Sequence, residues 1–249
     1  MMGQFDLTED QRAIQEMAAK FTADAITPFA AQWDEQHIFP RATIKAAAEL
    51  GFGAIYVSEG SGGIGLGRLE AALIMEAMAY GCPATSAFIS IHNMAAWMID
   101  CFGSDDLKAR YLPDLISMER IASYCLTEPG SGSDAAALKT SARLEGDHYI
   151  VSGAKQFISG AGENEVYVVM VRTGEAGPRG IIIAFRDNHF SNPDGLMRYV
   201  LSQGSLAKVR PDMKIVFIGD FEKPKDRLKG TISLMRDIVR IAEKEVGVK

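Results

Sequence analysis

Residues 124–134, with the sequence YCLTEPGSGSD, combine hydroxyl groups and glycines in a pattern that suits ligand binding. Gly130 and Gly132 would let a ligand approach the backbone closely, and Ser131 and Ser133 can both donate and accept hydrogen bonds. A predicted strand ends just before the glycines, so backbone amides at its end would also be available. A polar turn that caps a helix is the alternative, because Ser and Asp are preferred N-cap residues.

A second glycine-rich segment, residues 60–65, has the sequence GSGGIG and matches the pattern G-x-G-x-x-G. Such glycines can bring the backbone close to a pyrophosphate at the N-terminus of a helix. A dinucleotide-binding turn needs a strand before it and a βαβ unit around it. The strand-like residues 53–57 precede the glycines, but helical patterns follow Arg68. We therefore expect a surface loop that joins two helices.

The histidines and cysteines are spaced in a way that argues against a metal centre. No HxxxH or CxxC pair occurs among His37, His92, His148, His189, Cys82, Cys101 and Cys125. We expect His92 to be a hydrogen-bonded residue inside a buried helix. Asp105 and Asp106 are expected in the first turn of another helix, where negative charge is favourable. The odd number of cysteines favours a reducing compartment over a disulfide scaffold.

The first 120 residues have the apolar spacing of helices. Thr8 is the expected N-cap of the first helix, and Gln11 completes a capping box. The most apolar pattern belongs to the fourth helix, which is expected to be buried between the others. The predicted helices span residues 8–27, 40–50, 68–80, 85–102 and 104–118.

Strand patterns replace the helical ones after residue 120. A Gly-Asp turn at residues 146–147 indicates a β-hairpin. The predicted strands span residues 120–127, 138–145, 148–151, 154–159, 166–172 and 180–185. A helical pattern at 193–203, a buried strand at 214–219 and an amphipathic helix at 231–245 then indicate part of an α/β unit.

These patterns predict an α+β fold with three parts. An N-terminal helical bundle (residues 1–120) precedes a partial antiparallel β domain (121–184), and a short α/β tail (185–249) follows. The charge changes at the second boundary. Residues 1–184 carry 13 Lys and Arg against 23 Asp and Glu, a net charge of −10, whereas residues 185–249 carry 13 against 9, a net charge of +4.

Composition excludes several classes of protein. The 249 residues are 47% hydrophobic and 23% charged, which is ordinary for a globular protein. The overall net charge of −6 argues against nucleic acid as a partner. No apolar stretch is long enough for membrane insertion, and the N-terminus has neither a signal-peptide core nor an Arg-rich presequence. We expect a location in the bacterial cytoplasm or, in a eukaryote, the mitochondrial matrix.

Several long motifs occur in the order in which one family carries them. The segments ASYCLTEPGSGSDAA (122–136) and GAKQFISGAG (153–162) resemble the acyl-CoA dehydrogenase family. LGFG (50–53) leading into GGIG (62–65) agrees, and ISIHNMAAWMID (89–100) is most similar to the branch that acts on isobutyryl-CoA. The resemblance runs from about Phe5 to Gly180.

The resemblance implies a flavoenzyme that dehydrogenates an acyl-CoA between Cα and Cβ. In this family a glutamate takes the α-proton, FAD accepts the hydride, and an electron-transferring flavoprotein takes the electrons. Ser133 is expected to contact both FAD and the acyl-CoA, and Phe157 stands where many relatives carry Trp. The residues that the resemblance places at the cofactor are Tyr124, Cys125, Leu126, Thr127, Glu128, Pro129, Gly130, Ser131, Gly132, Ser133, Phe157, Ile158 and Ser159. Candidates for the wall of the acyl pocket, or alternatively for core packing, are Tyr80, Phe88, Ile91 and Met94.

The resemblance ends near residue 180, before the family's glutamate segment and its usual oligomer interface. Glu243 and Glu245 lie in an exposed-looking amphipathic pattern, so no catalytic residue is assigned. We therefore expect an incomplete chain that binds FAD weakly and shows no turnover by itself. A non-catalytic fragment or interaction module is the first alternative. Residues 211–246 faintly resemble the nucleotide-sugar half of retaining glycosyltransferases, and a sugar-nucleotide-dependent transferase fragment is the second.

Overall fold

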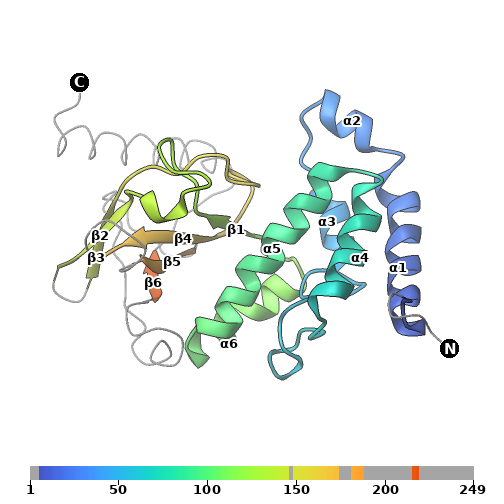
Figure 1. Ribbon diagram of the computed structural model, residues 1–249, viewed down its shortest axis with the longest axis horizontal. Helices are drawn as coiled ribbons and strands as arrows, with labels where there is room; N and C mark the ends of the chain where they lie inside the picture. The colour runs from blue at the N-terminus through green and yellow to red at the C-terminus, as the bar shows by residue number, and fades with distance from the viewer. Residues whose placement is uncertain (1–5, 146–147, 174–180, 188–214, 219–249) are drawn as a thin grey trace. The chain divides into compact units, whose positions relative to one another are not determined.

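The computed structural model describes residues 6–145, 148–173, 181–187 and 215–218. It divides into two compact units (Figure 1). One contains the chain up to Asp100 together with Tyr111–Glu119, and the other contains Cys101–Arg110 and the chain from Arg120 onward. The first unit is helical and the second is built on a sheet, so the predicted α+β class is confirmed.

The helical segments begin with α1, whose capping box is present as predicted. The Thr8 hydroxyl accepts from the Gln11 backbone N–H at 3.2 Å, and the Gln11 side chain accepts from the Thr8 N–H at 3.0 Å. Gln11 also donates to Glu70 at 2.8 Å, which links α1 to α4. The segments are α1 (Glu9–Phe21), the π-helix η1 (Thr22–Ile26), α2 (Ala30–Glu35), α3 (Arg41–Ala48), the 3₁₀ turn η2 (Glu59–Ser61), α4 (Arg68–Ala79), α5 (Pro83–Phe102) and α6 (Asp105–Ile116).

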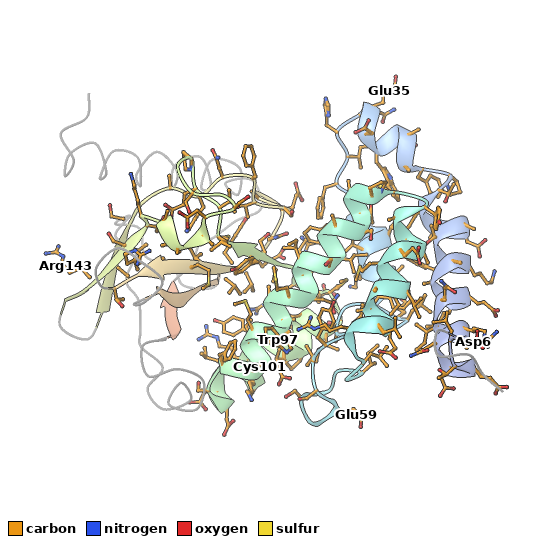
Figure 2. The ribbon with its side chains drawn as sticks, in the orientation of Figure 1. Asp6, Glu35, Glu59, Trp97, Cys101 and Arg143 are labelled. Atoms are coloured by element: carbon orange, nitrogen blue, oxygen red, sulfur yellow. The ribbon has the colours of Figure 1, made fainter. Side chains whose placement is uncertain are left out.

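Helix α5 is largely buried, as its apolar sequence predicts. Ile89, Ala95, Ala96 and Ile99 of this helix have no exposed surface. Trp97 and Cys101 are spaced four residues apart toward its C-terminal end, where Figure 2 labels them. Other side chains of the helical core, all completely buried, are Ile26, Ile44, Phe52, Ile55, Ile74 and Met78.

The strand expected at residues 53–57 is wrong, because this buried segment has an irregular backbone. Side chains of α5 take the place of a strand partner. The Ile55 N–H donates to Asn93 Oδ1 at 2.6 Å, and the Ser58 N–H donates to Asp100 Oδ2 at 2.8 Å. Asn93 also donates to the Phe52 carbonyl at 2.7 Å. These polar groups satisfy the buried backbone that a sheet would otherwise pair.

The second unit contains one six-stranded sheet in the order β3-β2-β4-β5-β6, with β1 also paired to β4. The pairs β2–β3 and β4–β5 are antiparallel, whereas β1–β4, β2–β4 and β5–β6 are parallel. The sheet is therefore mixed: the predicted antiparallel pairing holds for β2–β3 and β4–β5, and the parallel pairs correct the rest of that prediction. The strands are β1 (Ala122–Cys125), β2 (Ser141–Glu145), β3 (His148–Ser152), β4 (Val166–Arg172), β5 (Ile181–Asp187) and β6 (Ile215–Ile218), and a 3₁₀ turn η3 (Ala135–Ala137) precedes β2.

Two further predictions on this unit have different outcomes. The strand expected at 154–159 is wrong: these residues form an irregular segment, and Phe157 adopts a positive φ of 57°. The strand expected at 214–219 is present as β6, paired to β5. The helices expected at 193–203 and 231–245 lie outside the described residues. The domain boundaries at 120 and 184 stay predictions.

Candidate functional site

The glycine-rich loop begins where β1 ends and closes on itself in a tight turn. The Glu128 N–H donates to the Ser131 carbonyl at 2.9 Å, and the Ser131 N–H donates back to the Glu128 carbonyl at 3.1 Å. The Ser131 hydroxyl donates to the Asp134 carbonyl at 2.7 Å. These bonds give residues 128–134 a defined conformation without any contact to a ligand.

Three of the residues predicted at the cofactor have side chains that the protein itself buries, namely Cys125, Glu128 and Ser131. The Glu128 carboxylate accepts from the backbone N–H groups of Lys139 at 2.6 Å and Thr140 at 2.9 Å, and from Lys155 Nζ at 2.7 Å. Burial would raise the pKa of Glu128, but these hydrogen bonds outweigh it and lower the pKa, so the carboxylate is ionised. The carboxylate thus ties the loop to the residues before β2 and to Lys155.

The outer side of the loop consists of Pro129, Gly130, Gly132 and Ser133, all exposed. A Cβ atom built on Gly130 or Gly132 would meet no atom within 4 Å, and neither glycine has a positive φ. Packing within the described residues therefore gives no reason for glycine at these two positions. Glycine there leaves room for the close approach of a bound molecule.

The residues just before the second predicted group, Phe157–Ser159, lie against the first segment. The Gln156 N–H donates to the Thr127 carbonyl at 2.9 Å, and Gln156 Nε2 donates to the Glu128 carbonyl at 3.3 Å. Lys155 Nζ donates to the Leu126 carbonyl at 2.8 Å. The structure thus brings together two segments that are about 30 residues apart in the sequence.

Among the described residues of this unit, Phe157 is the most exposed large apolar side chain, at 87% of its maximal surface. Its φ of 57° lies in the left-handed region, which costs a bulky residue about 1–3 kcal/mol and persists only when its neighbours hold it. An exposed aromatic ring on a strained backbone is typical of a binding site rather than of a packing position.

Ser159 and Tyr124 are two further residues predicted at the cofactor. The Ser159 carbonyl accepts from the Ser123 hydroxyl and from Asn164 Nδ2, which ties this segment to β1. Tyr124 is half-buried. Burial raises the pKa of its phenol, with a further contribution from Cys125. Its hydroxyl therefore stays protonated near neutral pH and can donate a hydrogen bond.

Residues that hold this arrangement were missed from the sequence, above all Lys155 and Arg172. Arg172 is buried at the end of β4, and its guanidinium donates to the Leu138 carbonyl at 3.0 Å and the Ala136 carbonyl at 2.6 Å. A signal was present for Arg172, because it is a charged residue at the end of an apolar run. A charged residue in such a position has to find buried partners.

The G-x-G-x-x-G segment is a loop between α3 and α4, as predicted. A Cβ atom on Gly63 would lie 2.2 Å from the Val57 carbonyl oxygen, and Gly62 and Gly65 have φ values of 89° and 58°. Glu59, labelled in Figure 2, lies at the start of this loop. Here the glycines serve local packing and backbone geometry.

His92 is a buried residue of α5, as predicted, and its Nε2 lies 2.9 Å from the Leu115 carbonyl. Burial lowers its pKa to about 4, although hydrogen bonds to the Leu115 and Gly53 backbones act in the opposite direction. Asp105 and Asp106 lie in the first turn of α6, also as predicted. Within the described ranges no group of three or more acidic, His or Cys side chains could hold a metal ion.

A pocket of about 660 Å³ lies within the helical unit, between segments 30–40 and 81–88 together with Ile44. Phe88 lines it and packs edge-on against Phe39, with ring centroids 4.9 Å apart. Tyr80, expected beside Phe88 in an acyl pocket, is 85% exposed, and Ile91 and Met94 are half-buried. None of the residues predicted at the cofactor lines this pocket.

Two family models match this chain. The model for the N-terminal domain of acyl-CoA dehydrogenases matches residues 8–119, and the model for the middle domain matches residues 123–192. Solved structures agree: butyryl-CoA dehydrogenase from Megasphaera elsdenii superposes with a TM-score of 0.68 at 26% identity, over 75% of this chain and 50% of that one. The chain belongs to the acyl-CoA dehydrogenase family.

Two individual relatives share more than half of their aligned residues with this chain. The chain is 58% identical over 176 residues to the mitochondrial isobutyryl-CoA dehydrogenase of Dictyostelium discoideum, and 54% identical over 175 residues to that of Bos taurus. Each alignment covers 70% of this chain and 42% of the relative, so the chain spans less than half the length of these relatives. A structure described as the FAD complex of PigA has a TM-score of 0.70 at 31% identity, over 75% of this chain and 50% of that one.

Proposed function

We propose that this chain provides the flavin-binding loops, and part of the acyl-CoA site, of an FAD-dependent acyl-CoA dehydrogenase. The substrate class is a short branched acyl-CoA such as isobutyryl-CoA, because two relatives above 50% identity carry that name. The observation that supports the proposal most directly is the contact between Gln156 and Thr127, which joins two segments expected at the same cofactor.

The residues present fit a planar, partly polar group such as a flavin. Thr127 offers a half-buried hydroxyl and Ser133 an exposed one. Phe157, from the second predicted group, offers an exposed ring. The open space at Gly130 and Gly132 would admit the backbone-close contact that a cofactor requires. FAD, when bound, would supply the hydride acceptor for Cβ of the substrate.

The chain's own residues would bind, orient and exclude water. Phe157 and Ile158 would cover one side of the flavin and keep water from the reacting carbons. The Thr127 hydroxyl and adjacent backbone amides would donate hydrogen bonds to polar atoms of the ring, and Ser133 would contact both FAD and the acyl-CoA. No residue of this chain is assigned as the base that removes the α-proton.

The partners and location follow from the same family. The electron acceptor would be an electron-transferring flavoprotein. One similar structure, 34% identical with a TM-score of 0.70, over 79% of this chain and 51% of that one, is described as an electron-transferring flavoprotein of Acidaminococcus fermentans. We place the protein in the mitochondrial matrix if it is eukaryotic, since the two named relatives are mitochondrial, and in the cytoplasm if it is bacterial. Among the described residues no helix is long and apolar enough to cross a membrane.

The test is a titration of FAD with the purified chain, followed by the visible absorbance spectrum at equilibrium. We expect the spectrum of FAD to change as it binds and the change to saturate. Ser133→Ala should weaken binding several-fold, because one hydrogen bond to the cofactor is lost. Ser141→Ala, a matched change of an exposed serine at the start of β2, should bind as the unaltered chain does. A chain that leaves the FAD spectrum unchanged at every concentration would contradict the proposal and favour a non-catalytic interaction module.

A further inference from the structure

A buried ion pair connects the two loops of the candidate site. Lys155 Nζ lies 2.7 Å from Glu128 Oε1, and the two side chains retain only 10% and 6% of their exposure. Two other ion pairs, Lys20–Asp24 and Lys45–Glu119, keep more than half of their exposure. Lys155–Glu128 is far more buried than either of them.

Each member of the pair has further hydrogen bonds that a simple ion pair would not need. Lys155 also donates to the Leu126 carbonyl, and Glu128 also accepts from the Lys139 and Thr140 N–H groups. Three segments thus converge on two side chains: the loop after β1, the residues before β2, and the residues after β3.

Burying two charges contributes little net stability, because the loss of hydration offsets their attraction. What such a pair does specify is geometry, since removing either partner leaves the other charge buried and uncompensated. The backbone residues next to this pair are Thr127, which lies between Leu126 and Glu128, and Phe157, two residues beyond Lys155.

The strained backbone of Phe157 needs such an anchor. Its neighbour Gln156 is held by both its backbone and its side chain. The N–H donates to the Thr127 carbonyl, and Nε2 donates to the Glu128 carbonyl. With Lys155 fixed by the ion pair, residues 155 and 156 are immobilised immediately before the left-handed residue. The side chain of Phe157 itself has almost no packing to hold it, at 87% exposure.

We propose that Lys155 and Glu128 are positioning residues. They hold the loop after β1, which contains Thr127, and the segment after β3, which contains Phe157, in one rigid arrangement that binds the flavin. The proposal rests on the proposed function, because it names flavin as the group that this arrangement binds. Neither side chain needs to touch the flavin, since both act through the backbone of the residues that do.

The test uses four variants of the full chain. Three are single changes, Lys155→Met, Lys155→Arg and Glu128→Gln, and the fourth is the exchange that combines Glu128→Lys with Lys155→Glu. We expect Lys155→Met and Glu128→Gln to weaken FAD binding about tenfold or more and to alter the visible spectrum of the bound flavin. Lys155→Arg retains the charge, so its FAD affinity and its flavin spectrum should lie close to those of the unaltered chain. The exchange should not restore them, because the N–H groups of Lys139 and Thr140 require an acceptor at position 128.

The control is Lys45→Met, which removes the exposed pair with Glu119 and should leave FAD binding unchanged. Amide hydrogen exchange provides a readout without flavin: in Lys155→Met the amides of Gln156, Lys139 and Thr140 should exchange faster. Variants that keep the affinity and spectrum of the unaltered chain would overturn the proposal while the proposed function stands. If the unaltered chain binds no FAD, the proposed function fails. Unchanged exchange at those three amides would in that case overturn the proposed positioning role as well.

Discussion

The residues predicted at the cofactor differ in how far the protein buries them. Glu128 and Ser131 are buried and define the loop, whereas Gly130, Gly132 and Ser133 lie on its outer side. The motif therefore combines residues that build the loop with residues that are available to a ligand. Sequence pattern alone could not separate these two groups, because Ser131 and Ser133 are identical in type and only two residues apart.

Adding a methyl group at Gly130 or Gly132 separates binding from folding. Gly130→Ala and Gly132→Ala should leave the free energy of unfolding unchanged or slightly higher, because the space is open and alanine restricts the unfolded chain. The same changes should weaken FAD binding, since the methyl group would occupy the space a cofactor approaches. Thermal melts and FAD titration measure the two effects. Equal FAD affinity in both variants would contradict a role for these glycines at the cofactor.

Gly153→Ala is the contrasting variant for that experiment. Gly153 has a φ of 147°, and a Cβ atom there would lie 2.5 Å from Thr140 Cα. This change should lower the melting temperature, as expected where an L side chain meets both strain and a backbone clash.

His92 makes the helical unit sensitive to acid. Its pKa is about 4 in the folded protein and 6.5 in the unfolded chain, so the unfolded chain binds the proton first as the pH falls. The stability that the neutral, buried ring contributes is full above pH 6.5 and is lost between pH 6.5 and 4, by up to about 3 kcal/mol. Chemical unfolding at a series of pH values should show this decline.

The variant His92→Gln removes the titration while it keeps a donor for the Leu115 carbonyl. Its free energy of unfolding should fall less steeply over the same pH range. His37→Gln changes an exposed histidine and should retain the full slope. A slope in His92→Gln as steep as in the unaltered protein would show that other groups cause the acid sensitivity.

At the scale of whole elements, periodicity located the long helices and missed segments whose conformation depends on distant partners. Helix α4 and strand β4 match their predicted ranges almost to the residue. Residues 53–57 and 154–159 look like strands because they are apolar, but their backbone groups bind side chains or carbonyls far away in the sequence. Propensity cannot report Asn93 or Thr127 as partners, since these contacts exist only after folding.

Two substitutions in the loop between α3 and α4 test whether its glycines are needed for packing. Gly63→Ala should destabilise the protein by about 1–3 kcal/mol, because a Cβ atom would overlap the Val57 backbone. Gly60→Ala in the same motif is the matched control, as nothing lies within 4 Å of its added Cβ. Thermal melts compare the two. Equal stability of both variants would return the motif to consideration as a ligand-binding turn.

For the whole molecule, charge and motif order were more informative than secondary structure. The change from −10 to +4 at residue 184 falls close to the end of the family match at residue 192. Family motifs also located both loops of the candidate site, although they are separate in sequence. What they could not provide is the mixed sheet, because the parallel pairing of β1 with β4 joins strands about 40 residues apart.

The last prediction concerns turnover by this chain. Neither Glu243 nor Glu245 lies in a segment that resembles the family's catalytic glutamate, so the α-proton of an acyl-CoA has no assigned acceptor in residues 1–249. Loss of a general base typically slows a reaction about 10²–10⁴-fold. We therefore expect isobutyryl-CoA to perturb the spectrum of the FAD-loaded chain without bleaching it, and dye reduction to stay at the background rate. Glu243→Gln and Glu245→Gln should leave that background unchanged. Rapid bleaching by isobutyryl-CoA would contradict this expectation, and its loss in either glutamate variant would identify the base.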